Sequence, residues 1–391
     1  MNAPSPRPDA AASDLAGAPS SAIDVGGNLV SLLADGHQIF APMLAAIEHA
    51  EREILLEMYW FGSDTIGQRF AAALRERARA GLRVCVVYDA IGSIEADQTM
   101  FDAMGADGVE VHQYNPINPW RRRFRLGFVS NRDHRKILVV DRKIAFTGGV
   151  NIGDEWVSEA EGGGGWRDDM VRLEGPVAHD LAAVFLRTWQ RVGGSGVRLD
   201  PPRPREAASK GPVRVIAGDY FGERREIRRT YLAEIRRARG YVFITNSYFV
   251  PDGIVRRALA KAVKRGVDVR VLLPAHNDVR AVQWASRGVY AWLLARGVKV
   301  YEYSRSILHG KTAVVDGRWC TVGTYNLDYR SWRDNLEVNV TIEHATIATA
   351  MRRRFEADLE QAAAIEAHAW GFRSLGDRFL QWVFYLFRKF L

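Results

Sequence analysis

Short apolar runs alternate with amphipathic stretches along most of the chain. Residues 52–61 (REILLEMYWF) and 81–89 (GLRVCVVYD) are rich in apolar and β-branched side chains, which is typical of buried strands. Residues 66–80 between them carry apolar side chains at helical spacing, and residues 28–50 also have helical spacing that predicts a helix at their end. This order of elements continues to about residue 114. It predicts an α/β fold with a mixed sheet flanked by helices.

The second half of the chain repeats the first. Residues 241–250 (YVFITNSYFV) predict a strand that matches the one ending at Phe61, and residues 252–274 predict a helix followed by a strand. The turns RAGLRV at 79–84 and KRGVDV at 264–269 are also alike. The pattern therefore predicts two homologous lobes, with any shared site at the interface between them.

Composition along the chain suggests where the lobes end. We expect the first lobe over residues 22–192, a linker rich in Gly, Pro and charge over 193–212, and the second lobe over 213–362. Residues 1–21 predict a disordered tail and lack the basic and apolar regions of a signal peptide. No apolar segment reaches the roughly 20 residues that a transmembrane helix needs. Residues 363–391 are expected to be an amphipathic membrane-contact segment.

A polar pattern recurs in the two lobes at the same spacing. It reads HRKILVVDRKIAFTGGVN at 134–151 and HGKTAVVDGRWCTVGTYN at 309–326. In both copies Lys follows His by two residues, Asp by seven, Gly by fourteen and Asn by seventeen. Packing explains the apolar runs at 137–140 and 312–315, which predict buried strands. Packing does not explain matching His, Lys and Asn residues, because polar groups contribute little to a core.

Together the two copies predict one composite site that acts on a phosphodiester. One imidazole can attack phosphorus, while the other protonates the leaving alcohol and then deprotonates the incoming one. Positive charge and amide donors can hold the non-bridging oxygens. Asn151 and Asn326 are the candidate phosphate-binding amides. The candidate catalytic residues are His134, Lys136, Asp141, His309, Lys311 and Asp316.

Each histidine should need an acceptor that fixes its tautomer. Glu337 follows His309 by 28 residues, and Asp168 follows His134 by 34, with the glycine run between them as the source of the extra length. Asp169 is the alternative to Asp168. We therefore expect Asp168 and Glu337 to orient the two imidazoles.

The motif aspartates allow two interpretations. Asp141 and Asp316 follow the apolar strands directly, so they could take a direct part in the site or brace the hairpin turn. Bracing is the interpretation that we favour. The motif otherwise offers Lys and Asn, whereas a metal site would present carboxylates or several clustered His, so we expect no metal and no cofactor.

Charge and cysteine content narrow the class of partner. The formal net charge of +8 suggests an anionic partner such as nucleic acid, acidic lipid or a phosphorylated substrate. Cys85 and Cys320 both lie in predicted strands, so neither a disulfide framework nor a zinc site is indicated, and a reducing compartment is the natural interpretation.

Two basic stretches with interleaved aromatic residues are candidates for the contact with that partner. Residues 116–128 (PINPWRRRFRLGF) form either a solvated turn or a lip that meets anionic headgroups or a phosphodiester backbone. Residues 379–391 form either a docked helix or an interfacial helix, and we favour the interfacial one, with Phe379, Trp382 and Leu386 on one face. The expected anchors are Phe379, Trp382, Phe384, Tyr385 and Phe387 with Arg378, Arg388 and Lys389, and Phe390 below them.

The paired motifs resemble those of the phospholipase D superfamily. More narrowly, GGVNIGDEW at 148–156 and TYNLDYRS at 324–331 resemble the bacterial cardiolipin synthases. The lack of an N-terminal transmembrane pair and the basic aromatic C-terminus resemble the synthase B branch. One departure is Gly149 and Thr324 in place of the more usual Gly-Ser, which we expect to affect a secondary phosphate contact.

This resemblance implies transfer of a phosphatidyl group from one phosphatidylglycerol to another with release of glycerol. It favours His134 as the nucleophile and His309 as the acid and base. The implied partners are anionic phospholipid and the membrane surface, with a peripheral location on the cytoplasmic face of the cell membrane, and no nucleic acid or obligate protein partner. A lipid hydrolase or nuclease would use the same site with water, and a non-enzymatic membrane-binding protein should have lost a motif residue, whereas all six are present.

Overall fold

The computed structural model describes residues 22–117, 131–197, 211–218 and 225–389. The predicted N-terminal tail, Phe390 and most of the linker and of the basic loop at 116–128 lie outside these ranges. Within them, no helix is both long enough and apolar enough to cross a membrane.

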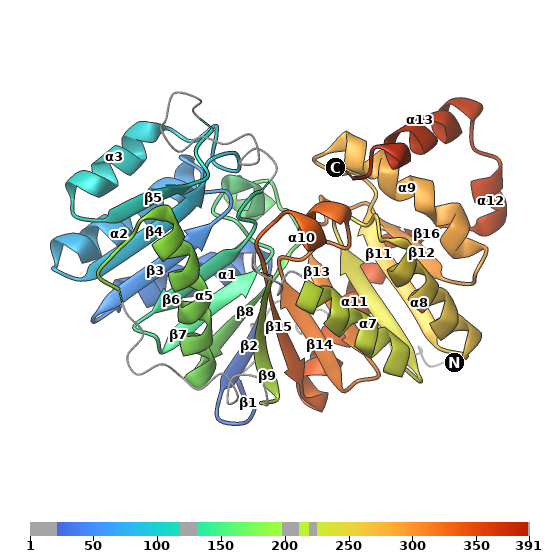
Figure 1. Cartoon of the computed structure of the whole chain (residues 1–391), viewed down its shortest axis with the longest axis horizontal. Helices are drawn as coiled ribbons and strands as arrows, with labels where there is room; N and C mark the ends of the chain where they lie inside the picture. Colours follow the sequence, from blue (N-terminus) through green and yellow to red (C-terminus); the bar gives the residue numbers. More distant parts are fainter. Residues whose placement is uncertain (1–21, 118–130, 198–210, 219–224, 390–391) are drawn as a thin grey trace, which may run out of the picture.

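The chain folds into two lobes that stand side by side, each built on one mixed sheet (Figure 1). The first sheet has the order β1 (Ile23–Asp24), β2 (Leu29–Ala34), β8 (Asp169–Glu174), β7 (Ile144–Gly148), β6 (Lys136–Val140), β3 (Glu53–Met58), β4 (Arg83–Asp89) and β5 (Glu110–Tyr114). The strands β3, β4 and β5 are parallel to one another, and the other pairs are antiparallel.

The second sheet repeats this arrangement. Its order is β16 (Ala362–Ala364), β12 (Lys299–Tyr303), β11 (Asp268–Pro274), β10 (Tyr241–Asn246), β13 (Lys311–Val315), β14 (Trp319–Gly323), β15 (Glu337–Glu343) and β9 (Val213–Gly218). Again three neighbouring strands, β10, β11 and β12, are parallel and the remaining pairs are antiparallel. The prediction of two homologous α/β lobes is confirmed.

Helices cover the outer face of each sheet. In the first lobe they are α1 (Asp35–Glu48), α2 (Thr65–Arg79) and α3 (Gln98–Ala106), and in the second α7 (Glu226–Arg237), α8 (Gly253–Lys264) and α9 (Arg280–Leu294). The duplication extends to the helix caps. Asp64 accepts a hydrogen bond from Gly67 N at the start of α2, and Asp252 accepts from Ile254 N at the start of α8.

A third apolar core joins the lobes, because the inner faces of both sheets pack against a shared layer. Val139 and Val171 of the first sheet and Val322 and Val340 of the second belong to one buried cluster. The helices α5 (Pro176–Val192) and α11 (Ala345–Leu359) contribute the rest of this layer. The interface between the lobes is therefore built like the interior of a domain.

One sequence prediction differs from the structure at the start of the chain. Residues 28–50 do end in a helix, but β2 occupies residues 29–34 before it. Leu32 is completely buried in β2 and pairs with Val171 of β8. Pairing with a distant strand determines the secondary structure of this segment, and the local spacing of apolar residues does not reveal that pairing.

Candidate active site

The two motif histidines lie at equivalent places in the two sheets. His134 lies two residues before the start of β6, and His309 lies two residues before the start of β13. Lys136 pairs with Met58 at the end of β3, and Lys311 pairs with Asn246 at the end of β10. Each motif therefore begins at the carboxyl edge of the parallel strands, where side chains from several elements meet.

Backbone hydrogen bonds between the lobes hold both histidines in place. The amide of His134 donates to Leu336 O at 3.0 Å, and the amide of His309 donates to Arg167 O at 2.7 Å. Short parallel bridges flank these bonds, from Asp133 to Leu336 and from Arg167 to Leu308. The lobes are thus joined directly beside each imidazole.

The acceptors of the two imidazoles are exchanged between the lobes. His134 Nδ1 lies 3.1 Å from Glu337 Oε2, although Glu337 belongs to the second lobe. His309 Nδ1 lies 2.7 Å from Asp168 Oδ2 of the first lobe. Asp168 and Glu337 are the residues that the sequence predicted, but counting along each lobe paired them with the wrong histidine. Asp169, the alternative, instead forms ion pairs with Arg167 and Arg354.

The two orienting carboxylates differ in their ionisation. Burial raises the pKa of Glu337 to about 7, although hydrogen bonds from Thr324 and Ser331 and the charge of Lys136 oppose this. Burial also opposes ionisation of Asp168, but the His309 charge and hydrogen bond outweigh it, and the Asp168 pKa is lowered. Asp168 is therefore a fixed anion, whereas Glu337 titrates near neutral pH.

Burial lowers the pKa of both motif histidines and of both motif lysines, and the charges of neighbouring basic groups lower it further for His134, Lys136 and His309. The pKa of His134 lies well below its usual value and that of His309 is also lowered, in both cases chiefly by burial. Burial and the charge of Lys311 lower the pKa of Lys136 to about 7, and burial lowers that of Lys311 to about 8. Both imidazoles are neutral at pH 7 in the free site, and each can offer a lone pair at Nε2.

Hydrogen bonds hold the lysines and asparagines of the motifs in place. Lys136 Nζ donates to His134 O at 2.8 Å, and Lys311 Nζ donates to His309 O. The amide oxygen of Asn151 accepts from Trp60 N, and that of Asn326 accepts from Ser247 Oγ. With each oxygen bound, the NH2 group of each asparagine is the part left for a ligand oxygen.

Asp141 and Asp316 lie at the other end of the motif strands, away from the histidines. The expectation that they are catalytic residues is therefore corrected. Each aspartate lies five positions after its lysine, which is roughly 17 Å along a strand. The carboxylate of Asp141 accepts from the amides of residues 51, 52 and 53, and that of Asp316 from the amides of residues 239, 240 and 241. Both aspartates therefore have a structural role, as we favoured, but they brace the start of the neighbouring strand and not the hairpin turn that we expected.

Aromatic side chains that the sequence analysis did not single out form the walls around the imidazoles. The Tyr59 ring packs edge-on against His134, with centroids 5.0 Å apart. The rings of Trp156 and Trp166 lie 5.4 and 5.8 Å from His309, and Trp156 Nε1 donates to Asp168. The signal for Tyr59 was present, because aromatic residues end the predicted strand at 52–61, but that pattern does not say what they face.

Thr324 and Gly149 have different roles from the phosphate contact that we expected. The hydroxyl of Thr324 donates to Glu337 Oε2, so it supports the acceptor of His134. Gly149 leaves room for the other acceptor, because a Cβ there would lie 2.1 Å from Asp168 Oδ1. Both departures from Gly-Ser concern the carboxylates that orient the histidines.

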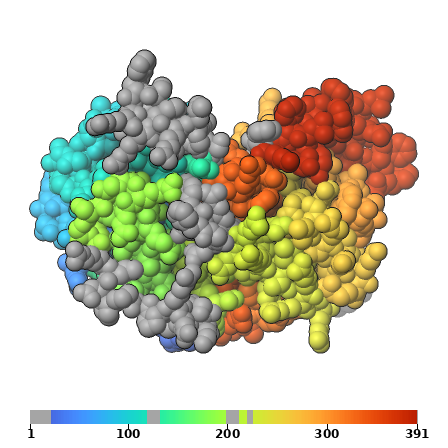
Figure 2. Space-filling view, viewed as in Figure 1, coloured from blue at the N-terminus to red at the C-terminus, as the bar shows by residue number. Residues whose placement is uncertain are grey.

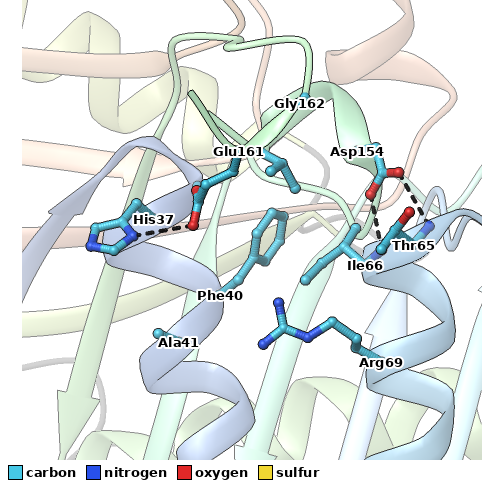
Figure 3. Close-up of a pocket in the computed structure, with 12 residues that line it drawn as sticks. His37, Phe40, Ala41, Thr65, Ile66, Arg69, Asp154, Glu161 and Gly162 are labelled. Carbon is cyan, nitrogen blue, oxygen red and sulfur yellow. Dashed lines mark hydrogen bonds and ion pairs between the residues drawn. The ribbon is translucent and has the colours of Figure 1, made fainter. Parts of the chain in front are cut away.

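A separate cavity of about 280 Å³ lies in the first lobe, between α1, α2 and the loop that contains Asp154 and Glu161 (Figure 3). Phe40 and Ile66 form its apolar wall, and the Arg69 side chain extends into it. Asp154 accepts from the amides of Thr65 and Ile66 at the start of α2. None of the motif residues lines this cavity, so it is distinct from the histidine centre.

Comparisons with known proteins find relatives that match most of the chain. A family model described as "Cardiolipin synthase, PLD-like domain" matches residues 43–189 and 231–359. A cardiolipin synthase of Geobacillus kaustophilus is 36% identical over 344 residues, which cover 86% of this chain and 67% of the relative. A cardiolipin synthase of Clostridium perfringens is 32% identical, covering 90% of this chain and 74% of the relative.

Solved structures share the fold at low sequence identity. A phosphatidylserine synthase of Haemophilus influenzae superposes with a TM-score of 0.70 over 97% of this chain and 99% of that chain, at 14% identity. A polyphosphate kinase of Porphyromonas gingivalis gives a TM-score of 0.59 over 87% of this chain and 49% of that chain, also at 14% identity. These two likenesses concern the fold alone.

Proposed function

The chain belongs to the cardiolipin synthase family of PLD-like proteins, and from this membership we propose that it transfers a phosphatidyl group between two phosphatidylglycerol molecules. The products are cardiolipin and glycerol. The observation that carries the proposal is the pair of neutral, buried imidazoles, each tied to a carboxylate of the other lobe and accompanied by a lysine.

In the first half of the proposed reaction, His134 Nε2 attacks the phosphorus of the donor lipid. The bond from phosphorus to the glycerol oxygen breaks, and His309 donates a proton from Nε2 to that oxygen. The bound phosphodiester is anionic, so it favours the protonated form of His309 that this step requires. Lys136 and Lys311 neutralise the oxygens of the pentavalent phosphorus.

In the second half, a hydroxyl of another phosphatidylglycerol attacks the phosphohistidine. Its proton moves to His309, the new bond from oxygen to phosphorus forms, and the bond from phosphorus to His134 breaks. Asp168 supports the role of His309, because an ionised acceptor at Nδ1 stabilises the imidazolium that forms at each proton transfer.

Incubation of the purified protein with phosphatidylglycerol vesicles tests the proposal directly. We expect mass spectrometry to detect cardiolipin and glycerol in equal amounts. Phosphatidic acid as the main product would instead identify water as the acceptor and a hydrolase. The same assay with EDTA present tests the expectation that the reaction needs no metal, which activity lost in EDTA and restored by one divalent ion would contradict.

We expect substrate binding to weaken as the pH rises from 6.5 to 8.5. The pKa values of Lys136 and Lys311 are lowered to about 7 and about 8, so both lose their charge over this range. Loss of a charge-assisted contact should raise KM for phosphatidylglycerol by about tenfold. Lys136→Arg should flatten the lower part of the rise, because arginine stays protonated. A constant KM for the unaltered enzyme across this range would contradict the charge assignment.

We also propose a peripheral location on the cytoplasmic face of the cell membrane, with residues 363–391 as the contact segment. Within this segment α13 (Leu375–Leu386) packs one face against α9 and leaves the other in solvent. Phe379, Trp382 and Leu386 are 61%, 57% and 50% exposed, so the predicted face points outward. The segment completes the proposed division into a first lobe (22–192), a linker (193–212) and a second lobe (213–362).

The other face of α13 packs closely on the body of the second lobe. Gly288 of α9 allows close approach, because a Cβ there would lie 3.1 Å from Gln381 O and 3.2 Å from the Tyr385 Cβ. Arg256 and Arg388 stack on the Tyr385 ring. Tyr385 therefore packs on the body of the protein, which corrects its inclusion among the membrane anchors. The docked interpretation describes this face of the helix, and we propose membrane contact for the exposed face.

The position of the segment supports an orientation of the enzyme on the bilayer. Lys389 Nζ lies 5.9 Å from the Tyr329 ring of α10 (Tyr329–Arg333), a short helix that follows Asn326 of the second motif. In the space-filling view the red C-terminal segment stands beside this orange region (Figure 2). A surface that contacts the exposed face of α13 would therefore lie near α10, which follows the second motif.

The double variant Phe379→Ser with Trp382→Ser should weaken binding to anionic vesicles by roughly a hundredfold. Replacing these two exposed aromatic rings by serine removes about 2–3 kcal/mol of the free energy of transfer from water into the bilayer interface. Co-sedimentation with phosphatidylglycerol vesicles measures this effect, and turnover of detergent-dispersed lipid should change much less.

Leu29→Ser is the matched control, because Leu29 is an exposed apolar residue in β2 of the first lobe, outside α13. This variant should bind vesicles normally. Equal binding by the double variant and the unaltered protein would show that α13 is only a packing helix.

A further inference from the structure

The helix α10 forms part of the wall of the histidine centre. Ser331 Oγ donates to Glu337 Oε1 at 2.7 Å and accepts from the amide of Asn326 at 3.3 Å. Asp328 caps the helix by accepting from Ser331 N at 2.8 Å. These bonds tie α10 to the acceptor of His134 and to the phosphate-binding asparagine, so the residue before Ser331 has a fixed position.

That residue is Arg330, and its side chain is a third cation at the site. It is half-buried, and it makes no hydrogen bond or ion pair with any residue in the described ranges. Its charge nevertheless contributes to lowering the pKa of His134 and opposes the rise in the pKa of Tyr59, whose ring contacts His134. A partly desolvated guanidinium without an acceptor is costly unless a ligand supplies one.

The repeat shows that this arginine is not part of the chemistry common to both lobes. Arg330 lies four residues after Asn326, and the residue four after Asn151 in the first lobe is Glu155. Histidine, lysine and asparagine are kept in both copies, whereas this position carries opposite charges. A cation that is present in only one of the two motif copies fits a step of the reaction that involves only one of the two lipids.

The acceptor lipid supplies such a step. Two phosphodiesters meet when cardiolipin forms, but only one is attacked, and the paired lysines and asparagines account for that one. The second belongs to the acceptor and lies across its three-carbon glycerol from the attacking hydroxyl. A second anion so close to the first requires its own counter-charge, and the arginine fork matches two oxygens of a phosphodiester.

We propose that Arg330 binds the phosphodiester of the acceptor lipid and so selects a phospholipid over water or a free alcohol in the second half of the reaction. This inference rests on the proposed function. Arg330 exchanges no proton and forms no bond to the transferred phosphorus. It positions the glycerol hydroxyl of the acceptor beside the phosphohistidine.

The test compares two acceptors that react with the same covalent intermediate. Cardiolipin formation uses an acceptor with a phosphate, whereas incorporation of deuterated glycerol into phosphatidylglycerol uses an acceptor without one. Arg330→Gln should lower cardiolipin formation by about tenfold to a hundredfold, the range for loss of a charge-assisted contact. Deuterated glycerol exchange should stay within about twofold, and Arg330→Lys should give an intermediate loss of cardiolipin.

Arg333→Gln is the matched control, because Arg333 is an exposed arginine on the same helix that pairs with Asp334. It should leave both rates unchanged. An equal fall of both rates in Arg330→Gln would overturn the proposal and assign the arginine to the transferred phosphate or to stability. No change in either rate would overturn it as well. If the unaltered enzyme exchanges glycerol but forms no cardiolipin, the proposed function fails instead.

Discussion

Replacing His309 with alanine should reduce cardiolipin formation by at least about 10⁴-fold and yet leave the enzyme able to form its covalent intermediate. The loss follows because the glycerol oxygen cannot leave without a proton. A phosphatidyl donor with p-nitrophenol as its headgroup needs no such proton. With this donor, His309→Ala should release at most one equivalent of nitrophenol and accumulate a phosphatidyl adduct on His134.

His134→Ala should lose turnover to the same extent as His309→Ala, but it should also fail to form the covalent intermediate. It lacks the proposed nucleophile, so neither donor should give a burst or an adduct, and peptide mass spectrometry can check this. His37→Ala is a suitable control, since this exposed histidine pairs with Glu161 in the first lobe. A burst in His134→Ala with the adduct on His309 would reverse the roles, and near-normal turnover in either variant would contradict a shared site.

Asp168→Asn should lower kcat by about 10³–10⁴-fold although Asp168 contacts no substrate. An asparagine can present its NH2 group to His309 Nδ1, which would move the imidazole proton to Nε2 and remove the lone pair that accepts the proton of the incoming alcohol. The imidazolium would also lose the anion that stabilises it. Steady-state kinetics on phosphatidylglycerol vesicles measure the effect.

Two neighbouring variants sharpen this test. Glu337→Gln should cost less, and its cost should grow as the pH rises through 7, because the pKa of Glu337 is about 7 and its carboxylate is increasingly ionised above that pH. Asp169→Asn should lower the melting temperature but keep kcat, since Asp169 pairs with Arg167 of its own lobe and with Arg354 of the second lobe. A loss of kcat in Asp169→Asn equal to that in Asp168→Asn would contradict the assignment.

Local patterns in the sequence were enough for most of the fold. The strand predicted at 81–89 is β4, and the helix predicted at 66–80 is α2, because both carry their hydrophobic period within a single element. The strand at 29–34 was not predicted, because its identity as a strand depends on pairing with β8, more than a hundred residues away. Such pairing leaves no periodic signal in the segment itself.

The same distinction holds for the site. Repetition of one spacing identified His134 and His309, and chemistry then predicted that carboxylates must accompany them. The exchange of Asp168 and Glu337 between the lobes could not be predicted from spacing, because it depends on the backbone bonds at Leu336 and Arg167. The packing of Trp156 on His309 was missed for the same reason.

The exchanged acceptors have a consequence for the symmetry of the molecule. In a pair of identical subunits related by a twofold axis, a residue of the first touches a residue of the second, and the reverse contact occurs as well. The crossed contacts of His134 and His309 have this isologous form, within a single polypeptide. Neither lobe alone would contain a complete histidine–carboxylate pair. Because both lobes belong to one polypeptide, they are always present in equal number, whereas separate subunits would have to associate to complete the pairs. That link also lets positions such as Glu155 and Arg330 differ, which identical subunits could not do.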